Sequence, residues 1–372
     1  KKMDRNVIYP CSPTLSRDLV EEILVRFPVR CLLRFKCVCK SWFYIISDPN
    51  FAKYHFDMAV APSDRVLLSF PNILEATSIE VEAPLLDNGC RVVVAPAPTQ
   101  KYEHIVDVVG SCRGFLLLVT ESPSDDDFIY FVIWNPSTGF QKRFNKVLNH
   151  PRLFGIGYDS SVDDYVVVTA TIRRSGPLST TIAFHCFSTR TNSWTCTEVN
   201  FPGPPLGPAC RHGSYLNGVL HWLVFTHDKD PLIIAFNVME RNILEISQPP
   251  REFKFPPYFC PFLRVMGGCL CLCIDSVRTA KTEIWTVKDY NVQSSWTRLF
   301  VYHTNHFQVL RFTTISFKKN GEILGHDDQN KDLVMINPPY LLETQALVLL
   351  RRSDQSLCST LYRESLLSLP VE

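Results

Sequence analysis

Three cysteines lie close together near the N-terminus, and cysteine is the residue type here with the clearest capacity for metal chemistry. Cys31, Cys37 and Cys39 fall within the stretch LVRFPVRCLLRFKCVCKSW, which runs from Leu24 to Trp42. On a helix these thiols would lie on different sides, and they lack the C-x2-C pair that zinc sites use. The spacing therefore disfavours a zinc site.

A second group of cysteines lies in the apolar run GGCLCLCI, residues 267–274. On a strand, Cys269, Cys271 and Cys273 would share one face, with successive residues about 7 Å apart. That separation is too large for these cysteines to share a zinc ion without another element. Buried free cysteine behaves as a small hydrophobic residue, so we predict that this face packs in the core.

The remaining patterns with catalytic potential are weak. The chain contains no G-x-S-x-G, H-E-x-x-H, Walker A or complete G-x-G-x-x-G motif. Gly155–Gly157 (GIG) and Asp125–Asp127 are predicted to form turns, the second of them solvated. His221 lies in an apolar strand and is predicted to be a core histidine with a satisfied hydrogen bond. We expect no catalytic residue, no metal and no cofactor.

The composition indicates a globular protein of more than one domain. Its 372 residues are 46% hydrophobic and 20% charged. The net charge of +1 argues against a nucleic-acid partner wrapped over much of the surface. Residues 1–58 carry ten Lys or Arg and six Asp or Glu, whereas the remainder carries 28 and 31. This asymmetry marks a basic N-terminal unit and favours an acidic partner for it.

Several features together predict a reduced compartment, the cytoplasm or the nucleus. The sequence begins Lys1-Lys2-Met3 without a secretory signal peptide, and it contains no N-x-S/T sequon with a permitted middle residue. No apolar run reaches the roughly 18 residues that would span a bilayer, so we expect no membrane partner. Most of the 14 cysteines lie in apolar runs, as expected of free thiols.

The N-terminal region has the spacing of four short helices. Ser16 can cap a first helix, which Pro28 ends. The apolar stripe of this helix comprises Leu15, Leu19, Ile23, Leu24 and Phe27. Further helices are predicted over residues 29–39 and 40–46, and Asp48-Pro49 has the pattern of a helix start. About forty residues are too few to bury this much apolar surface, so the module either docks on the rest of the chain or presents a helical face to a partner.

This module resembles an F-box of the plant type. The family pattern is Leu-Pro-x-x-Leu-x-x-x-Ile-Leu-x-Arg-Leu-Pro, then Ser-Leu-x-Arg-Phe-x-x-Val-Cys-Lys-x-Trp, then Asp-Pro-x-Phe. The matching residues are Leu15, Leu19, Ile23, Leu24, Arg26, Pro28, Leu32, Arg34, Phe35, Val38, Cys39, Lys40, Trp42, Asp48, Pro49 and Phe51. Ser16, Phe27 and Cys31 depart from the pattern, and the first departure removes a proline from the start of the first helix.

The resemblance implies that the module binds the acidic adaptor Skp1, which links it to a cullin. The module's excess of four positive charges suits such a partner. The Skp1-binding residues expected from this resemblance and from the module's surplus of apolar surface are Leu15, Leu19, Ile23, Leu24, Pro28, Leu32, Leu33, Phe35, Val38 and Trp42. A DNA-reading helix is the competing interpretation, but the basic residues recur around the helix and do not form one stripe with aromatics.

The rest of the chain repeats with a long period. Asn135, Asn237 and Asn337 end the similar runs VIWN, IAFN and VMIN, at separations of 102 and 100 positions. Trp194 and Trp296 end a second type of run and are again 102 positions apart. Two related units of about 51 residues therefore alternate. The four middle units start near residues 131, 182, 233 and 284. The recurring Asn and Trp residues are predicted to form turns and to pack the units.

Six such units fit into the residues that follow the helical module. They predict a β-propeller-like domain with six blades, because closing blades into a ring removes exposed sheet edges. Residues 356–369 are predicted to pair with residues 65–70 and close that ring. The expected fold class is α+β multidomain, with a helical F-box over residues 14–58 and an all-β propeller-like domain over residues 59–372. A β-sandwich with irregular additions is the alternative.

This second region also resembles a family, the plant F-box-associated domain that is often labelled F-box/kelch-repeat. The resemblance lies in GSCRGFLLLV (Gly110–Val119), VIWNPSTG (Val132–Gly139) and LNGVLHWLV (Leu216–Val224). Kelch signatures with a Gly-Gly pair in each blade are mostly missing, since Gly267-Gly268 is the only such pair. S-locus F-box proteins of pollen, which target pistil ribonucleases, share the two-part layout, and no residue in this sequence separates them from other plant members.

The two resemblances imply the substrate-recognition subunit of an SCF-type (Skp1–cullin–F-box) E3 ubiquitin ligase, a non-catalytic adaptor that bridges Skp1 to a protein substrate. The rival classes are a propeller-fold enzyme or sugar-binding protein, which a fold alone does not exclude, and an F-box protein that acts without ubiquitin transfer. Substrate is expected on the divergent loops at one face of the propeller. The expected substrate-binding residues are Arg173, Arg174, Arg251, Phe253, Tyr258 and Phe259, because Arg and aromatic residues anchor interfaces.

Overall fold

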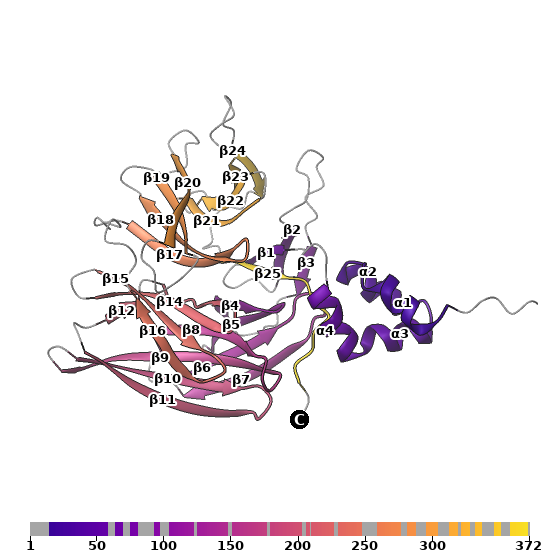
Figure 1. Cartoon of the computed structure of the whole chain (residues 1–372), viewed down its shortest axis with the longest axis horizontal. Helices are drawn as coiled ribbons and strands as arrows, with labels where there is room; N and C mark the ends of the chain where they lie inside the picture. The colour runs from indigo at the N-terminus through magenta and orange to yellow at the C-terminus, as the bar shows by residue number, and fades with distance from the viewer. Residues whose placement is uncertain are drawn as a thin grey trace, which may run out of the picture. The chain divides into compact units, whose positions relative to one another are not determined.

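Short helices precede a long series of antiparallel strands in this chain (Figure 1). The structure, a computed structural model of the whole chain, describes residues 15–58, 64–69, 75–80, 93–96, 104–122, 125–147, 151–176, 179–202, 206–208, 210–226, 230–247, 259–276, 281–287, 295–303, 312–318, 321–327, 332–336, 346–350 and 358–370. The chain divides into two compact units, residues 1–62 with 365–367, and residues 63–364 with 368–372. No helix within the described ranges is long and apolar enough to cross a membrane.

Within the described residues the first unit contains four helices, and the first and fourth of them begin at the predicted caps. The helices are α1 (Arg17–Leu24), α2 (Val29–Phe35), α3 (Lys40–Ser47) and α4 (Pro49–Met58). The backbone N–H of Leu19 donates to Ser16 Oγ at 3.4 Å, and that of Asn50 donates to Asp48 Oδ1 at 2.9 Å. The predicted extension of the second helix to Cys39 is wrong, because α2 ends at Phe35 and a turn follows.

The helical unit has a small core of its own. Its buried apolar residues include Val20, Leu24, Val29, Leu32, Ile45, Ile46, Phe51 and Phe56. Residues 365–367 near the C-terminus belong to the same compact unit. Leu366 and Leu367 are only 8% and 4% exposed although they lie outside any helix or strand. The helical unit therefore contains buried apolar residues from both ends of the chain. About forty N-terminal residues alone could form only a small core, and the two C-terminal leucines enlarge it.

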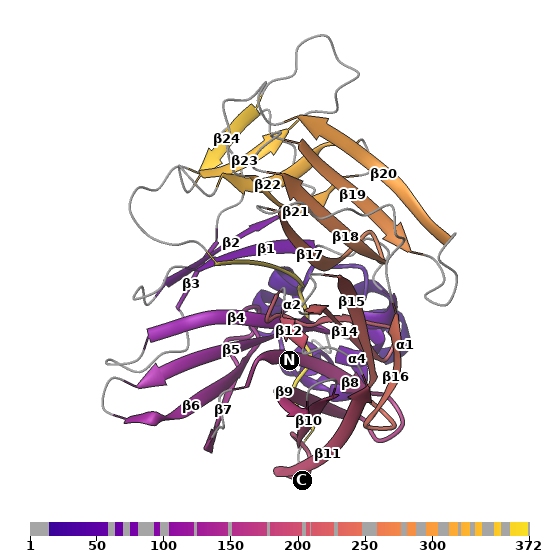
Figure 2. The same cartoon turned by 90° about the vertical axis from the view of Figure 1, so that its left-hand side faces the viewer.

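The second unit is built from six antiparallel sheets (Figure 2). The sheets of its first half are β25 (Cys358–Arg363) with β1 (Asp64–Ser69), β2 (Glu75–Glu80) and β3 (Val93–Pro96); β4 (His104–Cys112) with β5 (Phe115–Ser122), β6 (Asp125–Trp134) and β7 (Gln141–Val147); and β8 (Leu153–Asp159) with β9 (Asp164–Gly176), β10 (Ser179–Ser188) and β11 (Ser193–Pro202).

The sheets of its second half have the same order of strands. They are β12 (Leu206–Pro208) and β13 (Ser214–Leu216), both paired with β14 (Val219–Thr226), then β15 (Pro231–Asn237) and β16 (Asn242–Ser247); β17 (Phe259–Met266), β18 (Cys269–Ser276), β19 (Lys281–Val287) and β20 (Trp296–His303); and β21 (Phe312–Phe317), β22 (Ile323–Asp327), β23 (Asp332–Ile336) and β24 (Ala346–Leu350).

The six sheets close into a ring. Strand β25 pairs antiparallel with β1 from Asp64↔Arg363 to Ser69↔Cys358, so the first sheet combines both ends of the domain. Inner strands of neighbouring sheets lie against each other, in the order β25, β4, β8, β13 and β17, and β21 returns to β25. The predicted six-bladed propeller and its closing segment are confirmed, and the alternative sandwich is excluded.

The sequence repeat corresponds to the third strand of each blade. The unit starts predicted near residues 131, 182, 233 and 284 fall within β6, β10, β15 and β19. Asn135 and Asn237 stand at the ends of such strands, where their side chains accept backbone N–H groups from Ser137 and Met239 at 2.9 Å. The predicted turn role of asparagine is confirmed at both positions. Asn337 lies outside the described residues.

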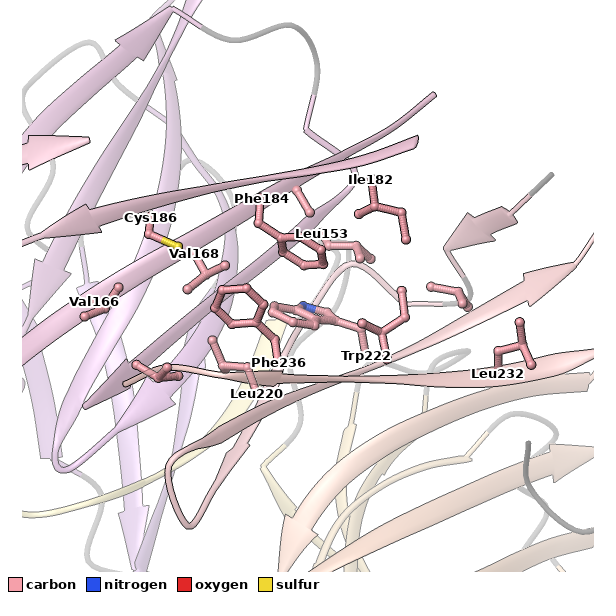
Figure 3. Close-up of a cluster of buried hydrophobic side chains, with 14 residues drawn as sticks. Leu153, Val166, Val168, Ile182, Phe184, Cys186, Leu220, Trp222, Leu232 and Phe236 are labelled. Atoms are coloured by element: carbon pink, nitrogen blue, oxygen red, sulfur yellow. The ribbon is translucent and has the colours of Figure 1, made fainter. Parts of the chain in front are cut away.

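A continuous apolar cluster joins the third and fourth blades (Figure 3). Trp222 of β14 is fully buried, and its indole N–H donates to the carbonyl of Phe154 on β8 at 2.9 Å. The rings of Phe184 and Phe236 stack with centroids 4.7 Å apart. Because these contacts link strands of different blades, they fix the angle at which one blade packs on the next.

The segment GIG, residues 155–157, is not the predicted turn, because it lies inside the inner strand β8. A Cβ atom on Gly155 would lie 2.8 Å from Leu220 Cδ2. A Cβ atom on Gly157 would lie 2.7 Å from Val238 Cγ2 and 3.0 Å from the Tyr215 ring. Glycine is required here because strand β8 approaches its neighbouring blade too closely for any side chain.

Because Gly157 packs closely against its neighbours, we expect an alanine at this position to destabilise the protein. Gly157→Ala is expected to lower the free energy of unfolding by about 1–3 kcal/mol, since Val238 and Tyr215 must shift to admit a methyl group. Gly207→Ala adds the same methyl group at a position where no atom of the described residues lies within 4 Å, and its effect should stay within about 0.5 kcal/mol. Urea denaturation of both variants measures the difference, and equal midpoints would contradict the packing argument.

Candidate protein-binding surfaces

Helix α1 carries two apolar faces, and only one of them is buried. Val20 and Leu24 lie four residues apart and are 9% and 0% exposed. Leu19 and Ile23 also lie four residues apart, but they are 49% and 43% exposed. The same row continues beyond both ends of the helix in Leu15, 61% exposed, and Phe27, 37% exposed. We call these four residues the α1 ladder. Such a contiguous exposed apolar row is typical of a protein-binding site.

Further exposed apolar side chains lie on α3 and on the turn that precedes it. Val38, Phe43 and Tyr44 are 61%, 47% and 69% exposed. The Phe35 ring forms edge contacts with Phe27 and with Trp42, at centroid distances of 5.1 and 5.4 Å. This aromatic chain connects the end of the α1 ladder to α2 and α3, so one end of the apolar surface has a fixed geometry.

Some of the predicted Skp1-binding residues are exposed in the structure, and others are partly or fully buried. Leu15, Leu19, Ile23, Pro28 and Val38 are exposed. Leu33, Phe35 and Trp42 are half-buried, and Leu24 and Leu32 are fully buried in the helical core. Core packing accounts for the residue type at the last two positions. A direct contact of any of these residues with an adaptor stays a prediction.

Basic side chains surround the apolar surface. Arg26, Arg30, Arg34 and Lys40 are exposed, whereas Lys36 is half-buried and burial lowers its pKa. Arg17 is already paired, since its guanidinium lies 2.6 Å from Glu21 Oε1 and 3.4 Å from Asp48 Oδ2. The exposed cations favour an acidic partner, chiefly by steering its approach and orientation.

The predicted substrate-binding residues fall partly outside the described part of the propeller. Arg173 and Arg174 are exposed near the end of β9, where Arg173 Nη2 lies 2.9 Å from Glu198 Oε1 and Arg174 Nε donates to the Gly176 carbonyl at 3.1 Å. Arg251, Phe253 and Tyr258 lie outside the described residues. Phe259 is the first residue of β17, and its side chain is likewise outside the description. A common site for these six residues stays a prediction.

One polar pair was not anticipated from the sequence. His212 Nε2 lies 2.6 Å from Asp107 Oδ2, although the two residues are 105 positions apart. Asp107 belongs to β4, and His212 forms an isolated bridge with Phe154 of β8. Packing of the second, third and fourth blades against one another brings these residues together, and their positions in the repeat differ. No spacing in the sequence could therefore have indicated the pair.

The buried histidine and the buried cysteines are core residues, largely as predicted. His221 is 0% exposed, and its Nδ1 lies 3.2 Å from the Ser214 carbonyl. Burial raises the pKa of the Cys271 thiol to about 11 and that of Cys273 well above its usual value, which keeps both thiols protonated. Cys269 is exposed, so its predicted burial is wrong; it directly follows the Gly267–Gly268 turn. Within the described ranges, no three His, Cys, Asp or Glu side chains are arranged to hold a metal ion.

The buried His221 side chain is expected to make the free energy of unfolding depend on pH. Burial lowers its pKa from 6.5 to about 4, so the unfolded chain gains a proton at a higher pH than the folded protein does. The free energy of unfolding should therefore fall as pH drops from 6.5 toward 4, by about 3 kcal/mol for this residue. Urea titrations of wild type and His221→Gln across this range isolate the contribution. Parallel pH profiles for the two proteins would contradict it.

Comparison with known families agrees with both halves of the chain. The F-box domain family matches residues 13–54, and the family described as "F-box associated beta propeller domain" matches residues 63–363. The chain therefore belongs to the family of F-box proteins with an F-box-associated β-propeller domain. The four helices carry the first match and the six blades carry the second.

Individual relatives share this layout along most of their length. The chain is 28% identical to the F-box/kelch-repeat protein At3g23880 of Arabidopsis thaliana over 313 residues, 80% of this chain and 82% of the relative. It is 26% identical to the F-box protein CPR1 of the same plant, over 92% of this chain and 85% of the relative. The resemblance to plant F-box proteins of the kelch-like type is confirmed.

Proposed function

We propose that this protein is the substrate-recognition subunit of an SCF-type E3 ubiquitin ligase. The F-box binds a Skp1-type adaptor and through it a cullin, and the propeller holds a protein substrate. The observation that carries the proposal is the α1 ladder, because it exposes four apolar side chains at helical spacing inside the part of the chain that matches the F-box family. The surrounding cations suit an acidic adaptor.

In this proposal the protein performs no covalent chemistry. Its contribution is proximity, since a bound substrate lysine is held at high local concentration near a ubiquitin-loaded enzyme. The cytoplasm and the nucleus are the proposed compartments, in keeping with the ten free cysteines within the described ranges. An F-box protein that sequesters its substrate without ubiquitin transfer would use the same two surfaces and is the second candidate.

Affinity purification of a tagged chain from plant cells under proteasome inhibition tests the proposal. We expect a Skp1-type adaptor and a cullin in the eluate, together with ubiquitinated proteins that disappear when the α1 ladder is mutated. Recovery of adaptor and cullin with an unmodified bound protein would support the sequestering alternative. An eluate without adaptor would contradict both candidates.

A further inference from the structure

The third blade of the propeller extends beyond its own inner strand. Strand β9 has 13 residues, whereas its inner neighbour β8 has seven. The pairing of these strands ends at Leu153↔Ala170, but β9 continues to pair with β10 as far as Gly176. On its inner side, residues 171–176 of β9 pair with no strand in the described part of the chain. They form a strand edge, which we call the β9 edge.

Backbone groups of the β9 edge point away from β10. The Ala170 carbonyl accepts the Arg152 N–H at 2.8 Å, on the side where β8 lies. Because successive residues of a strand direct their backbone groups to opposite sides, those of Ile172 and Arg174 also point to that side. Among the described residues this edge has no partner strand, and a sheet edge of this kind can accept an additional strand from another chain.

Four exposed arginines lie around this edge. Arg173 and Arg174 belong to β9 itself, and Arg152 immediately precedes β8. Arg211 packs its guanidinium over the Phe154 ring, 5.0 Å from the centroid, and reaches the Pro151 carbonyl at 3.4 Å. Hydrogen bonds between Phe154 and the segment 211–213, at 2.8 and 2.7 Å, hold that segment along the start of β8.

The balance of charge around the edge is positive. The described acidic residues that contact this surface are Glu198, paired with Arg173, and Asp107, paired with His212. Four arginine charges therefore face two carboxylates. The cations lie along a backbone edge and not on a flat face, so a ligand that offers both carboxylates and a peptide backbone matches the surface best.

We propose that the β9 edge, with Arg152, Arg173, Arg174 and Arg211, binds an extended acidic segment of a protein by adding it to the third blade as a further strand. The inference deepens the proposed function, because that segment would belong to the substrate that the receptor selects. Backbone hydrogen bonds to Ile172 and Arg174 hold the segment. Arg173 and Arg174 point to opposite faces of β9, so acidic side chains on one face of the added strand meet Arg174 and those on the other face meet Arg173. Nucleic acid fits less well, since a phosphate chain offers no peptide backbone to pair with the β9 edge.

The test uses the full chain and short fluorescent peptides in a binding titration. A peptide of alternating glutamate and threonine is expected to bind, and a lysine–threonine peptide is not. A glutamate–threonine peptide that is methylated on every backbone nitrogen has the same charge but no backbone donors, so it should bind about tenfold more weakly. Arg152→Glu combined with Arg174→Glu should weaken the glutamate–threonine peptide by at least about tenfold.

A matched variant controls for net charge. Arg190 and Arg298 are exposed on other parts of the propeller, so Arg190→Glu with Arg298→Glu makes the same change in charge and should leave binding unchanged. Equal losses in both double variants, or equal affinity for the unmodified and the N-methylated glutamate–threonine peptides, would overturn the proposal. Tighter binding of single-stranded RNA, lost in the Arg152 and Arg174 variant, would assign the surface to nucleic acid instead.

Adaptor binding in the same preparations separates this inference from the proposed function. If wild type captures a Skp1-type adaptor but no acidic peptide, the β9 edge assignment fails and the receptor function stands. If the peptide binds and the adaptor does not, the surface assignment stands and the receptor function fails.

Discussion

Replacing Leu19 and Ile23 together by aspartate is expected to abolish capture of a Skp1-type adaptor while the protein stays folded. Both side chains are more than two-fifths exposed in the chain alone, so neither contributes much to the helical core. Buried apolar anchors of an interface are worth about 2 kcal/mol or more each, so the pair corresponds to a loss of roughly a thousandfold in affinity. Calorimetric titration of the adaptor measures this loss directly.

Met58→Asp is the matched control for that experiment. Met58 is 53% exposed at the end of α4, outside the residues that match the F-box family. The Met58→Asp substitution places a carboxylate at an exposed apolar position of the same unit, and we expect adaptor binding to be unchanged. If this variant weakens binding as much as the α1 ladder variant, repulsion from the acidic adaptor and not loss of the ladder would explain the result.

Arg65→Met is expected to destabilise the propeller by about 3–5 kcal/mol. Arg65 lies on β1, the strand that β25 pairs with to close the ring, and its side chain is only 5% exposed. Its guanidinium donates to Ser78 Oγ at 2.6 Å and lies 3.4 Å from Glu364 and 3.8 Å from Glu80. Removing the cation leaves two partly buried carboxylates without a countercharge, and it does so where the two ends of the domain meet.

An exposed ion pair provides the comparison for Arg65. Arg173 and Glu198 lie 2.9 Å apart with side chains 59% and 57% exposed, so Arg173→Met should cost less than about 1 kcal/mol. Thermal and urea denaturation of the two variants give the difference in free energy of unfolding. If the two losses are similar, the buried network does not hold the ring closed in the way that its geometry implies.

Much of the fold follows from the sequence because the propeller repeats its own strand pattern. The period of about 51 residues appears in the Asn and Trp positions, and each repeat became the third strand of a blade. The pairing of residues 65–70 with the C-terminal region was predictable for the same reason, since a ring needs a strand to close it. The helix starts were predictable from the local chemistry of Ser16 and Asp48.

Other features depend on distances between elements, which a sequence pattern does not contain. The α1 stripe was predicted as one face, but Leu24 packs inside while Leu19 and Ile23 remain outside. The glycines of β8 seemed to indicate a turn, because glycine serves both turns and close strand packing. Arg173 and Arg174 were expected on a loop, but they lie in strand β9, whose extension forms the β9 edge. Each of these differences reflects which neighbour a residue meets after folding.

The most direct test of the account is the affinity of the purified full chain for a purified Skp1-type adaptor, measured by calorimetry. The account predicts a complex of one chain with one adaptor, with a dissociation constant of about 1 μM or lower, and loss of binding in the Leu19→Asp and Ile23→Asp double variant. No heat of binding from a folded wild-type chain, or equal binding by the double variant, would contradict the assignment of this protein as an adaptor-linked receptor.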